Sequence, residues 1–173
     1  TRRDLPTQIF LIERSASDDD LKGTLAHYDR ALLVYPESSA QLFPVLSQAV
    51  SDSDVRAAVI PYAGRYWFKR FLEAAEGLNA DPLALVSLHR ELQGKLAAPD
   101  LQPFAMHLLG SLIKEGRYAD ARELMKSIPA LPAAAPIEIG FSEATTDPRL
   151  APLAWTLSND DVVQAEVLGG NLI

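Results

Sequence analysis

Apolar residues recur at helical spacing from residue 4 to residue 128. Phe68, Phe71, Leu72 and Ala75, for example, stand at positions i, i+3, i+4 and i+7, which gives a helix one apolar face. Polar or proline-containing breaks separate one such stretch from the next. The pattern predicts helices over 4–16, 19–35, 39–50, 55–62, 67–76, a stretch that opens at Asp81-Pro82, 104–115 and 118–128.

Capping residues mark several of these helix ends. One side chain of the segment 17–20, Ser-Asp-Asp-Asp, is expected to cap the second helix, and Asp52 or Ser53 the fourth. Pro36 should stop the second helix. The acidic run in 17–20 does not follow the spacing of a calcium loop, which alternates its oxygen ligands and ends on a glutamate, so we interpret it as a cap.

The turn at residues 115–121 is the most specific local signal in the chain. Its sequence is Glu-Gly-Arg-Tyr-Ala-Asp-Ala, and Gly116 can close the preceding helix in a left-handed conformation. Ala121 is small enough for two helices to cross closely, and we expect Tyr118 to fill the groove beside it. The turn predicts a helical hairpin, and with the other helices it predicts a mainly α fold built as an array of antiparallel hairpins.

The pattern changes around Pro129. Three prolines between residues 129 and 136 exclude a helix there. Beyond them, apolar and polar residues alternate, as at Ile137, Ile139 and Phe141, which is typical of strands. Short strands are predicted over 137–141, 153–157 and 162–167. The helices, a partner chain or a larger β module truncated here would have to cover them.

These patterns predict two domains, a helical domain over 1–130 and a Pro-rich linker with a short β segment over 131–173. The helical part resembles tetratricopeptide-like repeats. The residues that carry this resemblance are Leu108, Gly116, Tyr118 and Ala121 in one hairpin and Tyr28, Ala31 and Pro36 in another. Because residues 41–95 lack the small residues of that family, the resemblance implies a degenerate α-solenoid. The whole chain is also similar to the C-terminal part of uncharacterised alphaproteobacterial repeat proteins, in phrases such as Trp67-Phe68-Lys69-Arg70-Phe71-Leu72.

Composition narrows the function mainly by exclusion. A net charge of −7 argues against general nucleic-acid binding, and the absence of cysteine excludes disulfides and thiolate chemistry. No apolar run reaches the roughly 18 residues of a membrane span. The chain starts at Thr1 without an initiator methionine or a signal-peptide pattern. We therefore expect the N-terminus to be missing, and the compartment stays open between the cytoplasm and the cell envelope or periplasm.

Motifs for chemistry are missing from the sequence. The three histidines do not form a zinc-binding H-E-x-x-H helix, and no G-x-S-x-G nucleophile turn occurs. We therefore expect a protein that is not an enzyme and holds no cofactor or metal. A non-enzymatic protein–protein interaction scaffold of a bacterium is the function we predict.

Two tryptophans are the candidates for a ligand platform, Trp67 and Trp155, since a flat indole ring can stack on a sugar. Buried anchoring of a helix or sheet is the alternative that we favour for both. The basic and aromatic run over 65–71 could also stack single-stranded nucleic acid, but its positions 68 and 71 are needed for the apolar face. The alternative function is a carbohydrate-binding module linked to the cell envelope or exopolysaccharide apparatus.

Overall fold

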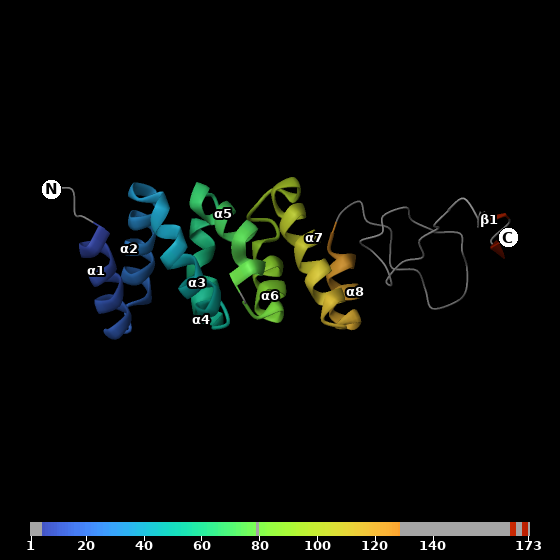
Figure 1. Ribbon diagram of the computed structural model, residues 1–173, viewed down its shortest axis with the longest axis horizontal. Helices are drawn as coiled ribbons and strands as arrows, with labels where there is room; N and C mark the ends of the chain where they lie inside the picture. The colour runs from blue at the N-terminus through green and yellow to red at the C-terminus, as the bar shows by residue number, and fades with distance from the viewer. Residues whose placement is uncertain (1–4, 79, 129–166, 169–170, 173) are drawn as a thin grey trace. The chain divides into compact units, whose positions relative to one another are not determined.

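The computed structural model describes residues 5–78, 80–128, 167–168 and 171–172, and this part of the chain is mainly α-helical (Figure 1). Short 3-10 turns (η) join some of the helices. The elements in chain order are α1 (Leu5–Ser17), α2 (Leu21–Val34), η1 (Pro36–Ser38), α3 (Ser39–Ala49), α4 (Ser53–Val59), η2 (Ile60–Tyr62), α5 (Tyr66–Ala74), η3 (Ala75–Leu78), α6 (Pro82–Leu92), α7 (Ala98–Lys114), α8 (Tyr118–Lys126), β1 (Val167–Leu168) and β2 (Asn171–Leu172).

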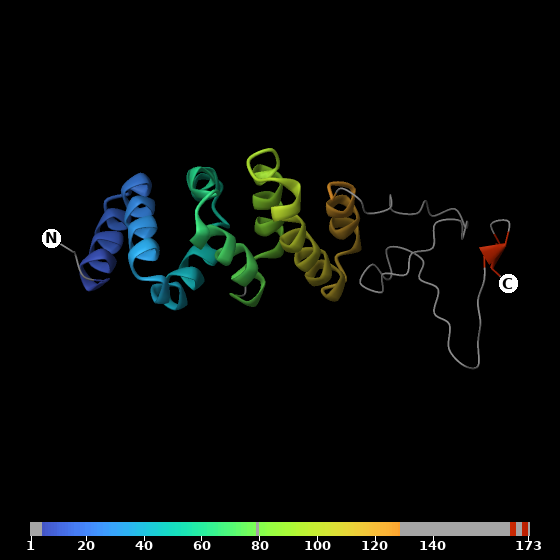
Figure 2. The ribbon, with the colours of Figure 1, turned by 90° about the horizontal axis from the view of Figure 1, so that it is seen from above.

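The chain divides into two compact units, Thr1–Phe104 and Ala105–Ile173. The first unit opens with α1 and α2, which lie side by side (Figures 1 and 2). The N-cap of α2 is Asp20, whose carboxylate accepts a hydrogen bond from the Gly23 N–H at 2.9 Å. A Cβ at position 23 would meet the Asp20 carboxylate, so glycine there leaves room for the capping side chain. The cap expected within 17–20 is therefore confirmed.

The predicted cap of α4 is confirmed as well, and α6 opens at Asp81-Pro82 as predicted. Asp52 accepts a hydrogen bond from the Asp54 N–H at 2.7 Å and starts α4. Asp81 accepts one from the Leu83 N–H at 3.1 Å, and Pro82 follows it as the first residue of α6. Pro36 ends α2 as predicted, although it then begins η1, which leads into α3.

Aromatic rings from α3 and α5 form the centre of the first unit's core. Phe68 and Phe71 are fully buried on α5, as the helical spacing predicted. Phe43 of α3 packs edge-on against Phe71, with 5.6 Å between the ring centroids. This packing holds α3 against α5 beside the site described below.

The turn before α8 has the predicted conformation. Gly116 has a φ of 74°, its N–H bonds to the Ile113 carbonyl at 3.0 Å, and the Arg117 N–H bonds to the Leu112 carbonyl at 2.8 Å. These two bonds form a Schellman cap on α7. Ala121 is fully buried on α8, as expected for a close crossing. Tyr118, however, is 48% exposed, so the expectation that it fills a groove is wrong.

The start of α7 also differs from the prediction. The sequence placed this helix at 104–115, whereas it begins at Ala98 and includes Pro103. A proline inside a helix removes one hydrogen bond to the carbonyl four residues earlier. Pro99 and Pro103 are both exposed, so water can hydrate the carbonyl left without a partner. The cost of the proline is thereby reduced, and the helix continues through it.

The predicted strands over 137–141 and 153–157 lie outside the described residues, as does the predicted domain boundary at 130. Of the third predicted strand, over 162–167, only Val167 is described, and it pairs with Leu172 in the short antiparallel ladder of β1 and β2. The C-terminal β segment and the array of hairpins stay predictions.

Candidate functional site

The indole of Trp67 is locked in place by a carboxylate on another helix. Trp67 is the second residue of α5 and is 4% exposed. Its Nε1 donates a hydrogen bond to Oδ1 of Asp29, on α2, at 2.8 Å. The bond links α2 to α5 and fixes the orientation of the indole ring. Because both partners are buried, water does not compete for it.

Asp29 carries its negative charge in a nearly closed environment, since only 9% of the residue is exposed. Its second oxygen, Oδ2, accepts a hydrogen bond from Nη2 of Arg65 at 3.1 Å. Arg65 lies just before α5 and keeps half of its side chain in solvent. The carboxylate therefore has a partner for each oxygen, which offsets much of the cost of burying a charge.

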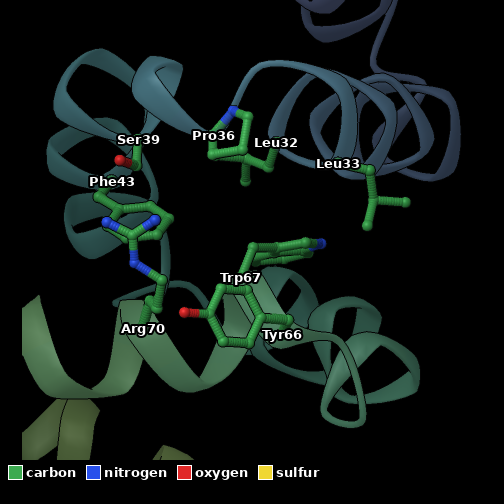
Figure 3. A pocket seen from close by; sticks show the side chains of 8 residues that line it. All are labelled: Leu32, Leu33, Pro36, Ser39, Phe43, Tyr66, Trp67 and Arg70. Carbon is green, nitrogen blue, oxygen red and sulfur yellow. The ribbon is translucent and has the colours of Figure 1, made fainter.

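A small hollow of about 80 Å³ lies next to Trp67. Residues of α2, η1, α3 and α5 line it (Figure 3). We call it the α2–α5 hollow, and its lining residues are Leu32, Leu33, Pro36, Ser39, Phe43, Tyr66, Trp67 and Arg70. Leu32, Phe43 and Trp67 are buried, whereas Leu33 is 49% exposed and Tyr66 75%. The hollow thus has a packed floor and an open rim of apolar groups.

Arg70 is the charged residue of the rim. It follows Tyr66 by one helical turn and is exposed. The two other cations near it in sequence are engaged, Arg65 with Asp29 and Lys69 with Asp100 at 2.9 Å. Arg70 forms no ion pair or hydrogen bond with another residue in the described part of the chain. Its guanidinium is therefore available to a ligand.

Of the two tryptophans predicted as ligand platforms, the structure describes Trp67 but not Trp155. Stacking on a sugar requires an open ring face, and Trp67 is buried, so it serves as an anchor between helices rather than as such a platform. Trp155 lies outside the described residues, and the carbohydrate-binding alternative depends on it alone. The exposed aromatic of this region is Tyr66, which the sequence brought in only as part of the run 65–71 and not as a candidate on its own. Its position outside the apolar stripe of α5 was the available signal.

Two other buried titratable groups lie outside the hollow. His89 on α6 is buried and packs against the Phe104 ring, with 6.2 Å between the centroids. Burial, and to a smaller extent the charge of Arg90, lowers the pKa of His89 below its ordinary value. Burial raises the pKa of Tyr28 on α2 to about 12. Neither group lines the hollow, and within residues 5–78 and 80–128 no group of three acidic or histidine side chains is placed to hold a metal ion.

Comparisons with known proteins do not extend this picture. No family model matches the chain, and no curated protein or solved structure matches it either. The likeness to tetratricopeptide-like repeats and to alphaproteobacterial repeat proteins therefore stays a prediction. Among the helices that the structure describes, none combines the length and the apolar content needed to cross a membrane.

Proposed function

We propose that this protein is a non-enzymatic protein–protein interaction scaffold and that a partner binds over the α2–α5 hollow. The observation that carries the proposal is the exposure of Leu33 and Tyr66 above a buried floor. Tyrosine is enriched among the residues that dominate binding at protein interfaces. The apolar rim around the hollow lets Tyr66 form part of an apolar interface core.

The floor of the hollow is preorganised. In this floor, the hydrogen bond to Asp29 fixes Trp67, and the edge-on contact with Phe71 fixes Phe43. A rigid surface loses little conformational entropy on binding, which favours affinity. The volume of about 80 Å³ suits one anchoring side chain of a partner, whereas pockets for small-molecule substrates usually enclose about 300–1,000 Å³.

The hairpin features support the scaffold class. The side-by-side packing of α1 and α2 and the Schellman turn before α8 are local elements of the kind found in helical repeats. On this proposal the helices form a degenerate tetratricopeptide-like array, followed by the short C-terminal β segment. Such arrays present side chains from successive helices along an extended binding surface.

Site-specific photocrosslinking tests the proposal. A benzoylphenylalanine replaces Tyr66 in one variant and Lys22 in a control variant, because Lys22 is exposed ten residues before Leu32 on α2, about 15 Å along the helix. We expect a discrete protein adduct from position 66 in host extract, and no such adduct from position 22. Leu33→Asp in the same chain should abolish it. Equal labelling from both positions, or no protein adduct at 66 together with turnover in a small-molecule screen, would contradict the proposal.

A further inference from the structure

The lining of the α2–α5 hollow is chemically uneven. Six of its eight residues are apolar or aromatic, the exceptions being Ser39 and Arg70. In the view of Figure 3, Ser39 and Arg70 lie toward one end of the hollow and Leu33 toward the other, and the Tyr66 hydroxyl points toward the polar end. A ligand that matches this lining carries an apolar group and a polar group side by side.

The charge of the rim specifies that polar group. The chain as a whole has a net charge of −7, yet the hollow bears a cation that is not neutralised by another described residue. Arg65 and Lys69 are held by Asp29 and Asp100, and Arg70 is not held in this way. A guanidinium presents a planar set of donors that matches a carboxylate and can bind both of its oxygens. An anionic oxygen pair is therefore the complement of Arg70.

We infer that the hollow binds acidic peptide segments of a partner protein in which an apolar residue lies close in sequence to an aspartate or glutamate. This inference rests on the proposed function. The apolar side chain enters between Leu33 and Trp67, and the carboxylate pairs with Arg70 at the polar end. The apolar contact supplies attraction for any peptide with a suitable side chain. The ion pair supplies the selectivity for an acidic neighbour.

A displayed library of random seven-residue peptides, selected against the full chain, tests this assignment. We expect the wild-type protein to enrich peptides in which Leu, Ile or Phe lies within two positions of Asp or Glu. Arg70→Gln should still enrich the apolar residue but lose the acidic preference. Lys69→Gln is the matched control, because its cation belongs to the pair with Asp100, and it should select the same motif as the wild type.

A pair of blocked peptides gives the effect a magnitude. Acetyl-Ser-Gly-Leu-Asp-Gly-Ser-amide and the same peptide with Asn in place of Asp differ only in the charge. We expect the wild-type chain to bind the acidic peptide about tenfold more tightly, as a charge-assisted hydrogen bond allows. The ratio should fall toward one in Arg70→Gln and decrease with added salt. Circular dichroism of the variant checks that its helices are retained.

The outcomes separate this inference from the proposed function. Enrichment of apolar residues with no acidic neighbour, or an unchanged acidic preference in Arg70→Gln, would overturn the inference and leave the partner adduct at position 66 as support for the scaffold. Failure to enrich any peptide would overturn it as well. Concentration-dependent dimerisation that Tyr66→Ser abolishes would assign the hollow to a second copy of this chain, and would also overturn it.

Discussion

The Asp29–Trp67 hydrogen bond should be among the strongest single polar contributions to the stability of the first unit. Trp67→Phe keeps an aromatic ring in the core but removes the N–H that donates to Asp29 at 2.8 Å. Hydrogen bonds to charged groups contribute about 1.5–3 kcal/mol. The carboxylate keeps its bond to Arg65 and 12% of its side-chain surface in solvent, so we expect a loss near the lower end, about 2 kcal/mol.

Asp29→Ala removes the same bond from its other side. The Trp67 N–H is then left buried without an acceptor, which costs about 1–3 kcal/mol. Arg65, half exposed, can be hydrated instead, so the loss of that ion pair adds less than about 1 kcal/mol. Asp29→Asn retains an oxygen that can accept from the indole and should cost less than Asp29→Ala. Arg65→Gln is the control, with an expected loss below about 1 kcal/mol.

Urea unfolding followed by far-UV circular dichroism measures these effects as a double-mutant cycle. We expect the losses of Asp29→Ala and Trp67→Phe to fall short of additivity by about 1.5–3 kcal/mol in the double variant, because each change removes the same bond. Losses that add to within about 0.5 kcal/mol would show two independent sites. That result would refute the view that this bond holds the floor of the hollow.

Three further predictions concern other parts of the chain. Gly116→Ala should lower the free energy of unfolding by about 1 kcal/mol because φ is 74° at that position. Gly110→Ala lies inside α7 with open space around it and should raise the free energy of unfolding by about 0.5–1 kcal/mol. Equal shifts in the unfolding midpoint would contradict the assigned cap. Ala121 is fully buried on α8, so Ala121→Leu should overpack its surroundings and cost about 1–3 kcal/mol, which an unchanged melting temperature would exclude. Burial lowers the pKa of His89 from its ordinary 6.5. The unfolded chain therefore takes up a proton near pH 6.5 that the folded chain takes up only at lower pH, so stability should fall as the pH drops below about 6.5. The fall should be smaller in His89→Phe, and equal falls in urea titrations would contradict this assignment.

Local rules predicted most of the helix ends. Asp20, Asp52 and Asp81 each cap a helix through their own side chain, and such caps act over two or three residues, so they are visible in the sequence. The start of α7 was missed because the cost of Pro103 depends on whether water reaches the carbonyl it leaves free. Exposure of that carbonyl is a property of the folded structure.

The site was only partly visible in the sequence. Trp67 was identified from its residue type, but its partner Asp29 lies 38 residues away in the chain, on another helix. One signal for Asp29 was available, since Leu25, Tyr28, Asp29 and Leu32 occupy positions i, i+3, i+4 and i+7 of an otherwise apolar stripe. A carboxylate in such a position requires a buried partner. The hollow itself was not predictable, because its walls come from α2, η1, α3 and α5 and depend on how these pack.

Oxidative footprinting with hydroxyl radicals tests the central claim most directly, with three tyrosines as internal probes. In the isolated chain, Tyr66 at 75% exposure and Tyr118 at 48% should react readily, and Tyr28 at 4% should not. After addition of the partner that crosslinks at position 66, we expect the oxidation of Tyr66 to fall severalfold while that of Tyr118 stays unchanged. If Tyr66 remains as reactive in the complex as in the free chain, the partner does not cover the α2–α5 hollow and the proposed binding site is wrong.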